Sequence, residues 1–419
     1  IEQCNGSGDC RKSYAFGGTM CPSFRATREE SHTTRARANT LRELMTRPRT
    51  KKIYDQREIL EVLDTCVSCK ACKSECPSNV DIARFKAEFL QQHYDVCGVP
   101  MKAFLIARLT EIQRLGTILP WFYNAIVRNR MTGNMLKRIL HFAPKRTIPI
   151  LYKTTLKHWL GRYRQKNRGE TVGKVFLFAD EFTNYMDVEI GIKMIELLDW
   201  LGYEVIIPKH VESGRTAISK GMLKVAKGVA RKNVLLLKDL VTENIPLVGI
   251  EPSCILSFRD EYPDLVGEDL KEEAVRLGKN CLLYDEFFIR EIRAGRIQAE
   301  QFTDQPLKIM LHGHCHQKSL ASVEPSREML SLPVNYSVEV IPSGCCGMAG
   351  AFGYEKKHYE LSMKIGEQVL FPAVRGAGEN VCISAPGTSC RQQIKDGTGK
   401  QALHPIEVLY EALKCTKEK

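Results

Sequence analysis

The stretch that decides the prediction is Cys66-Val-Ser-Cys69-Lys-Ala-Cys72-Lys-Ser-Glu-Cys76-Pro77. Its cysteines are separated by two, two and three residues and followed by proline, which is a spacing by which polypeptides hold iron–sulfur clusters. Three thiolates on one tight loop can reach three corners of one cluster, while the fourth turns away toward a second cluster. Zinc sites more commonly bring two separated cysteine pairs or a mixed cysteine and histidine set. The run therefore predicts iron–sulfur ligation.

Such a run requires a partner segment, and one lies upstream in residues 4–22. Read in register, the two segments predict two ligand sets. These are Cys21, Cys66, Cys69 and Cys72 for cluster A, and Cys4, Cys10, Cys76 and Ser7 for cluster B. Because a serine oxygen is a weaker iron ligand than a thiolate, cluster B is expected to be a three-iron cluster, a four-iron cluster with one weak ligand, or absent.

The rest of the first 97 residues is predicted to be helix and loop around these cysteines. After Cys76, apolar residues recur at helical spacing, from Val80 to Phe89. Four arginines lie between the two cysteine segments, at Arg25, Arg28, Arg35 and Arg37. They belong either to an ordinary solvated helix or to a group of cations that lie near the clusters and raise their reduction potentials.

Residues 98–170 are predicted to be a basic helical connector. Between Gly98 and Arg168 there are fifteen Lys and Arg against one acid, Glu111, so this segment carries +14 and the remainder −2 of the total net charge of +12. Apolar residues at helical spacing, interrupted by prolines, predict several short helices. Three interpretations stay open: helices on a membrane surface, a docking face for an acidic partner, or a subdomain with a solvated basic face. No nucleic-acid recognition motif accompanies the charge, so nucleic acid is not an expected partner.

The C-terminal half alternates strand and helix patterns, which predicts α/β units with mostly parallel sheets. Two strand-like runs, 203–208 and 338–342, both end in proline. Cys254 follows the first proline by 46 residues, and Cys390 follows the second by 48. This internal alignment predicts a tandem duplication, with one copy over residues 171–305 and the other over residues 306–419.

The second copy keeps cysteines that the first has largely lost. Cys345 and Cys346 precede Gly347, and adjacent thiolates can grip one metal only from a tight turn of the kind that glycine allows. Other cysteines would follow neighbouring strands, where ligands converge in open α/β sheets. The candidates are Cys315, Cys345, Cys346 and Cys390, with Cys254 from the first copy and His314 or His316 as an imidazole. A metal or iron–sulfur site, redox-active thiols without metal, and a site that has lost its function all stay open.

The chain of 419 residues is long enough for two or three domains. It contains no run of 18 apolar residues, so no membrane-spanning helix is expected. Its sixteen cysteines are clustered and accompany no secretory signal, which indicates metal ligation in a reducing compartment and a cytoplasmic location. The first residue is Ile1 rather than Met, and we expect the chain to be cut from a longer polypeptide.

These motifs resemble those of known iron–sulfur proteins. The head is similar to the two-cluster helical ferredoxin domain of the glycolate oxidase iron–sulfur subunit and of the C subunit of anaerobic glycerol-3-phosphate dehydrogenase. The C-terminal half resembles the paired cysteine-rich CCG domains of those proteins and of the B subunit of heterodisulfide reductase. The whole chain resembles the C-terminal part of large FAD-linked oxidases acting on D-2-hydroxy acids such as D-lactate or D-2-hydroxyglutarate. The stretches that carry the resemblance include Cys4-Asn-Gly-Ser-Gly-Asp-Cys10, Glu251-Pro-Ser-Cys254, His312-Gly-His-Cys-His-Gln317 and Gly387-Thr-Ser-Cys390.

The resemblance implies an α-helical ferredoxin-like domain followed by tandem α/β CCG domains. It also implies a flavin domain upstream of Ile1, in the same polypeptide or in a partner chain, which holds FAD and selects the substrate. Electrons would pass singly from the flavin through one [4Fe-4S] cluster, and a second that is [3Fe-4S] or [4Fe-4S], to a quinone or another acceptor. The present chain is not expected to oxidise the substrate alone. Its expected location is cytoplasmic, with peripheral contact at the inner face of the membrane.

Two departures from the family pattern stand out. Ser7 lies where a ferredoxin has a cysteine, and Gly387 lies where a full CCG domain has the first cysteine of a Cys-x2-Cys pair. Two other functions also stay open from the sequence. One is a stand-alone iron–sulfur subunit of a multi-chain oxidase, and the other is a thiol-disulfide redox enzyme that uses the cysteines of the second copy.

Overall fold

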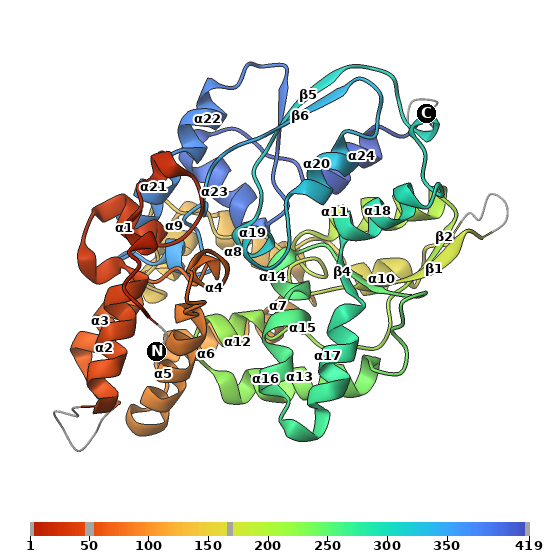
Figure 1. Cartoon of the computed structure of the whole chain (residues 1–419). Helices are drawn as coiled ribbons and strands as arrows, with labels where there is room; N and C mark the ends of the chain where they lie inside the picture. The colour runs from red at the N-terminus through yellow and green to blue at the C-terminus, as the bar shows by residue number, and fades with distance from the viewer. Residues whose placement is uncertain (1–3, 47–53, 166–170, 415–419) are drawn as a thin grey trace.

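The computed structural model describes residues 4–46, 54–165 and 171–414 of the chain (Figure 1). A helical region comes first and two α/β regions with parallel sheets follow, as the sequence predicts. Within these residues, no helix combines the length and the apolar character needed to cross a bilayer.

The head is built from short helices around a core in which cysteines replace many of the usual aliphatic side chains. Its helix α5 begins after Asp81, whose carboxylate accepts a hydrogen bond from the Arg84 amide at 3.1 Å and so caps the helix. The helices of the head are α1 (Pro22–Thr27), α2 (Thr34–Thr46), α3 (Arg57–Asp64), α4 (Ala71–Glu75) and α5 (Ile82–Cys97).

The connector continues as five short helices, and its last residues, 166–170, lie outside the described part. Arg146 ties the connector to the second α/β unit. Its guanidinium donates to the Gly353 carbonyl at 2.8 Å and pairs with Asp396 at 3.0 Å, although the side chain is fully buried. The helices are α6 (Met101–Ala107), α7 (Leu109–Gly116), α8 (Pro120–Arg128), α9 (Arg130–Ile139) and α10 (Leu156–Leu160).

The first α/β unit has a four-stranded sheet in the order β2-β1-β3-β4, and all of its pairings are parallel. Helices α11 and α18 cover one face, while α13, α15 and α17 cover the other, so the strands are apolar on both faces. The elements are β1 (Gly173–Phe178), α11 (Val188–Trp200), β2 (Tyr203–Ile206), α12 (Arg215–Ser219), α13 (Leu223–Leu237), β3 (Leu247–Gly249), α14 (Pro252–Ile255), α15 (Ser257–Asp260), α16 (Tyr262–Leu265), α17 (Lys271–Lys279), β4 (Cys281–Leu283) and α18 (Tyr284–Arg293).

The second unit has a three-stranded parallel sheet in the order β6-β5-β7. Its helices α20 and α24 pack against α18 and α11 of the first unit, and one continuous core joins the two units. The elements are β5 (Leu307–Leu311), α19 (Cys315–Leu320), α20 (Glu324–Leu330), β6 (Tyr336–Val340), α21 (Tyr359–Glu367), α22 (Leu370–Gly376), β7 (Val381–Ser384), α23 (Thr388–Thr398) and α24 (Pro405–Glu411).

The two sheets share one strand order. In each, the first strand lies in the middle, with the second strand on one side and the third on the other, and the first unit adds β4 at its edge. Strands β2 and β6, which precede the aligned prolines Pro208 and Pro342, therefore occupy equivalent positions in their sheets. The same is true of β3 and β7, which precede Cys254 and Cys390.

Candidate metal centres

The loop that carries three predicted ligands of cluster A curls tightly before α4. Ser68 and Lys70 adopt left-handed backbone conformations, with φ of 52° and 65°, which is uncommon for residues other than glycine. Across from this loop, the chain turns into α1 at a third left-handed residue, with φ of 54°. One cavity is lined by all four predicted ligands: Cys21, Cys66, Cys69 and Cys72.

These four thiols are buried, and burial controls their chemistry. Burial and the nearby Cys315 thiol raise the pKa of Cys69, while burial and Cys66 raise the pKa of Cys72 to about 12. Cys69 and Cys72 therefore stay protonated at neutral pH unless a bound cation holds them as thiolates. Four buried thiols around one cavity fit an iron–sulfur cluster, which supplies the positive charge that this donor set lacks.

Cations surround this cavity. Arg37 lines it, and Arg25 is buried near Cys21. Arg28 instead turns outward and donates to the Ser13 hydroxyl at 3.1 Å. Lys86 was not predicted from the sequence; its side chain is partly buried, and its ammonium group donates to the carbonyl of a predicted ligand residue, Cys66, at 2.7 Å.

The predicted ligands of cluster B are only partly gathered. Cys10 and Cys76 are buried in the cysteine-rich core of the head, and Cys4 packs against it. The Cys10 thiol lies beside Cys21, which lowers the pKa of Cys10 to about 6. Ser7, in contrast, is exposed. The described geometry thus places the Cys10 thiol beside a predicted ligand of cluster A, keeps Cys76 in the same core, and leaves Ser7 on the surface.

A second group of thiols lies at the carboxyl ends of β5, β6 and β7. Cys345 lies between Cys315 and Cys346, close enough to exchange hydrogen bonds with both, and Cys346 in turn adjoins Cys390. The turn depends on Gly347, which has a φ of 92° and whose added Cβ would lie 2.4 Å from the Ser362 carbonyl oxygen. The structure therefore brings together the four cysteines that the sequence proposed for the second copy.

An imidazole of this group belongs to His312, from the same run of residues as His314 and His316, which the sequence prediction named. Its ring nitrogen, Cys346 Sγ and Cys390 Sγ all lie within 4.8 Å of one another. His312 Nδ1 contacts the Ser343 hydroxyl at 2.7 Å, and the buried ring also lies close enough to the Cys346 thiol to exchange a hydrogen bond with it. Burial lowers the pKa of His312 to about 4, so the ring is neutral at pH 7, the form that binds metal. The sequence signal that could have identified His312 is its position directly after strand β5.

The other two histidines have different partners. His314 caps α19 by accepting the His316 amide hydrogen at 3.2 Å, and His316 Nε2 contacts the Ser68 carbonyl oxygen at 3.0 Å. An added Cβ at Gly387 would lie 2.5 Å from a carbon of the His314 ring and 3.2 Å from Cys390 Sγ. The His314 ring thus occupies the space that a cysteine at position 387 would need.

Cys254 lies in a separate group. Its thiol and the carboxylates of Asp180 and Glu181 lie within 4.8 Å of one another, at the carboxyl ends of β3 and β1. Burial and Glu181 raise the pKa of Asp180 to about 8, and burial also raises that of Cys254. The structure therefore divides the predicted five-cysteine set into four thiols on the second unit and one on the first.

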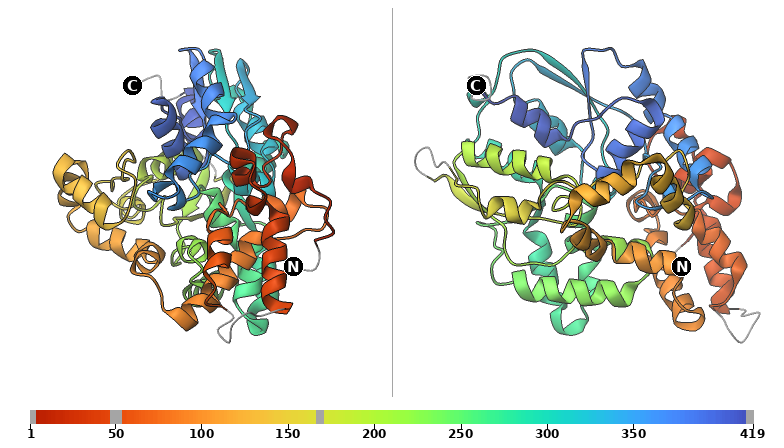
Figure 2. Two further views of the ribbon diagram at one scale, coloured as in Figure 1. Left: turned by 90° about the vertical axis from the view of Figure 1, so that its left-hand side faces the viewer. Right: turned by 180° about the vertical axis from the view of Figure 1, so that it is seen from behind.

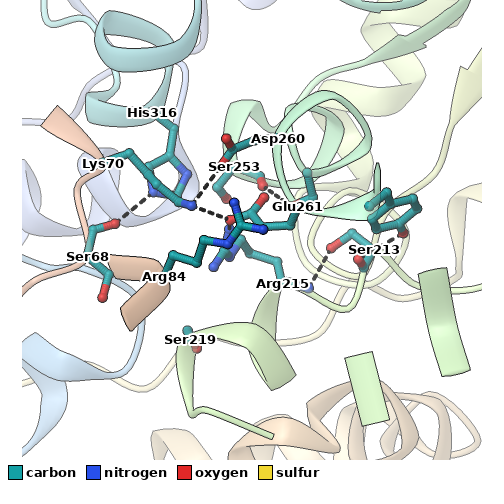
Figure 3. Close-up of polar contacts among 12 residues, drawn as sticks. Ser68, Lys70, Arg84, Ser213, Arg215, Ser219, Ser253, Asp260, Glu261 and His316 are labelled. Carbon is teal, nitrogen blue, oxygen red and sulfur yellow. Dashed lines mark hydrogen bonds and ion pairs between the residues drawn. The ribbon is translucent and has the colours of Figure 1, made fainter. Parts of the chain in front are cut away.

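The two candidate centres adjoin each other through α4 and α19. The Ser319 hydroxyl donates to the Cys69 carbonyl at 3.1 Å. His316 contacts Ser68 in the same loop (Figure 3). Cys315, at the start of α19, lies close enough to Cys69 to influence the pKa of its thiol. The thiols that line the cavity of cluster A and two thiols of the second unit, Cys315 and Cys345, thus belong to one buried core.

A buried network of charges holds the same loop against the first unit (Figure 3). Lys70, between two predicted ligands, places its ammonium group 3.2 Å from Asp81, 2.6 Å from Asp260 and 3.2 Å from Glu261. Arg215 pairs with Glu261 at 2.6 Å. Burial acts to lower the pKa of Lys70, but the three carboxylates outweigh it and raise that pKa. The network keeps Lys70 charged beside the cavity.

A pH prediction arises from His210 of the first unit. Burial lowers its pKa to about 3, so the folded state keeps the ring neutral while the unfolded chain, with a pKa near 6.5, takes up a proton. Because its pKa is depressed in the folded state, neutral His210 contributes its full stability above pH 6.5, and this contribution is lost as the pH falls. Between pH 7.5 and 5.5 the free energy of unfolding of the wild-type should therefore decrease by about 1.4 kcal/mol more than that of His210→Gln. Urea unfolding at both pH values measures this difference, and equal losses would contradict it.

Comparison with known proteins agrees with the cysteine geometry. Residues 3–81 match a family described as a 4Fe-4S dicluster domain. The chain is 25% identical to the D-2-hydroxyglutarate dehydrogenase of Escherichia coli strain K12 over 98% of its own length and 43% of that protein. It therefore spans less than half of this relative.

Two shorter relatives lie nearer to the chain in length. The chain is 26% identical to the C subunit of anaerobic glycerol-3-phosphate dehydrogenase of Escherichia coli strain K12, over 80% of this chain and 83% of that relative. It is 27% identical to lactate utilization protein A of Bacillus subtilis strain 168, over 56% of this chain and 98% of that protein. The domain match and these relatives together support an iron–sulfur electron-transfer role in a dehydrogenase.

Proposed function

We propose that the chain is the electron-transfer portion of an FAD-dependent D-2-hydroxy-acid dehydrogenase. A flavin domain upstream or in a partner chain would oxidise the substrate, and the electrons would pass through this chain to a quinone or another acceptor. The observation that carries the proposal is the cavity lined by Cys21, Cys66, Cys69 and Cys72. It is reinforced by the cysteine-rich unit packed directly against the loop of that cavity.

The residues of the head would hold cluster A and set its surroundings. A bound [4Fe-4S] cluster supplies a one-electron carrier. The four thiolates anchor it, Arg37 and Lys70 provide positive charge beside it, and Lys86 fixes the Cys66 backbone. Charge, hydrogen bonding and burial are the means by which a protein tunes such a carrier. Cluster B would use Cys4, Cys10 and Cys76 in the head, which we propose to be ferredoxin-like.

We further propose that both α/β units are CCG domains and that the second holds a metal or an iron–sulfur cluster. Its ligands would be Cys315, Cys345, Cys346 and Cys390, with His312 as a fifth donor. The buried His312 ring supports this assignment, because its nitrogen lies within 4.8 Å of two of these thiols and imidazole and thiolate are both common metal ligands. Cytoplasmic location and contact with the inner face of the membrane complete the proposal.

Two alternatives are each favoured by one observation. A stand-alone subunit would fit the extent of the match to anaerobic glycerol-3-phosphate dehydrogenase, which covers most of the C subunit of that enzyme. A thiol-disulfide enzyme would fit the second unit, because Cys345 and Cys390 lower the pKa of Cys346 and favour its reactive thiolate. Metal analysis separates the second alternative from our proposal.

The proposal predicts the iron content of anaerobically purified protein. About four iron and four sulfide per chain are expected from cluster A alone, and more if other centres are filled. Reduction with dithionite should produce an electron-paramagnetic-resonance signal that accounts for about one spin per reducible cluster. Anaerobic reconstitution of chemically stripped protein provides the control. Folded, reconstituted protein with less than one iron per chain would overturn the proposal and leave the thiol-disulfide enzyme.

A further inference from the structure

The connector carries an apolar tip with no charge. Residues 115–127, which span the end of α7 and nearly all of α8, contain no acidic or basic side chain and are bracketed by Arg114 and Arg128. Ile118 is 72% exposed and Trp121 is 68% exposed, and Leu115, Leu119 and Phe122 are exposed beside them. Monomeric proteins seldom leave large apolar side chains gathered in this way unless something covers them.

Helix α9 extends the same apolar character. Met131, Met135 and Ile139 recur at intervals of four residues, so they lie along one side of the helix, and all three are exposed. Helices α8 and α9 pack against each other. We call the exposed apolar side chains of residues 115–122 and of α9 the connector surface.

The charges around the connector surface are almost all positive. The single acid of α7, Glu111, is 3.3 Å from Arg108 and is thereby paired. The remaining exposed cations on these helices are Arg114, Arg128, Arg130 and Arg138. Protein segments that bind the interface of an anionic bilayer typically combine exposed apolar and aromatic side chains with surrounding cations, as the connector does.

The position of the surface also favours lipid over the upstream part of the protein. In the left view of Figure 2, the orange-to-yellow helices of the connector project on one side, and the red helices of the head lie on the other. A domain attached to the red side of the head would lie away from the connector surface. Because the area is basic, its natural complement is a negatively charged surface.

We propose that the connector surface docks the protein on the anionic leaflet of a membrane. Trp121 and Phe122 enter the interface between headgroups and acyl chains, and the arginines contact lipid phosphates. This inference rests on the proposed function in one respect, since a quinone acceptor would lie in the same bilayer. The docking itself requires no electron transfer and can be tested separately.

The test is co-sedimentation of anaerobically purified protein with sucrose-loaded vesicles at low salt. Vesicles of phosphatidylcholine with about 30% phosphatidylglycerol serve as the anionic probe, and pure phosphatidylcholine as the neutral one. We expect binding to the anionic vesicles only, loss of binding in high salt, and a blue shift of tryptophan emission. The double variant W121S/F122S should lower the bound fraction about tenfold or more and remove most of the shift.

The matched control is Leu235→Ser, which removes another exposed large apolar side chain, on α13 of the first unit. It should bind like the wild-type. Equal binding by W121S/F122S and wild-type, or no binding to anionic vesicles, would overturn the inference. So would binding that disappears when the flavin-containing protein is used, because the connector surface would then be a contact between protein domains. The cluster signal, recorded on the same samples, reports failure of the proposed function independently.

Discussion

Replacement of Cys69 by serine is expected to remove cluster A and with it about four iron per chain. The hydroxyl is nearly isosteric with the thiol, so the buried loop can keep its shape, but an alcohol oxygen binds iron poorly. Cys69 faces the cavity and lies near Cys315, so it stands at the junction of both candidate centres. The dithionite-reduced resonance signal of cluster A should disappear.

The matched control for this variant is Cys382→Ser. Cys382 lies in β7, is partly buried and is not among the residues that line the cavity of cluster A. It should keep the wild-type iron and sulfide content and the wild-type signal. Retention of full iron and signal in Cys69→Ser would refute the ligand assignment, provided that circular dichroism shows both proteins folded.

Replacement of Lys70 by methionine is expected to lower the free energy of unfolding by about 3 kcal/mol or more. The ammonium group is buried among Asp81, Asp260 and Glu261, and its removal leaves carboxylates with fewer partners in a medium that penalises unpaired charge. Arg215 still pairs with Glu261, which places the loss at the lower end of the range known for broken buried networks. Urea unfolding of the anaerobic protein measures it.

An exposed pair offers the control for Lys70→Met. Lys224 pairs with Asp95 at 2.7 Å, but its side chain is 73% exposed. Lys224→Met should therefore cost less than about 1 kcal/mol. A redox titration of the same proteins provides a second readout, because loss of a cation beside cluster A should shift its reduction potential to more negative values. Equal stability of the two variants would contradict the role assigned to the network.

Some features of the candidate sites were legible in the sequence because they depend on spacing along the chain. The interval between Cys66, Cys69 and Cys72 is set by the reach of one loop, and Cys21 was recognised by its own proline and register. The four cysteines of the second unit were recognised because each follows a strand, and the ends of parallel strands meet. The structure gathers both sets.

Other features escaped the sequence because they depend on which direction a side chain takes. His312, His314 and His316 lie within five residues, and their spacing alone does not show where each ring turns. In the structure the first lies within 4.8 Å of two thiols, the second caps α19 and adjoins Cys390, and the third contacts Ser68 of the head. Cys254, placed by the repeat with the other cysteines, joins two carboxylates of its own sheet.

The order of residues along the chain was sufficient to predict an iron–sulfur class of metal centre, a helical head and two α/β units with parallel sheets. These predictions were possible because ligand spacing and hydrophobic periodicity are local properties of the chain. Packing between distant segments was needed to select the imidazole, to separate Cys254 from the four-thiol group, and to bury Lys70 among carboxylates up to 191 residues away. These outcomes arise because the head docks on both units. Steric fit and the free-energy cost of burying charge then determine which contacts form, and the sequence alone does not distinguish these contacts.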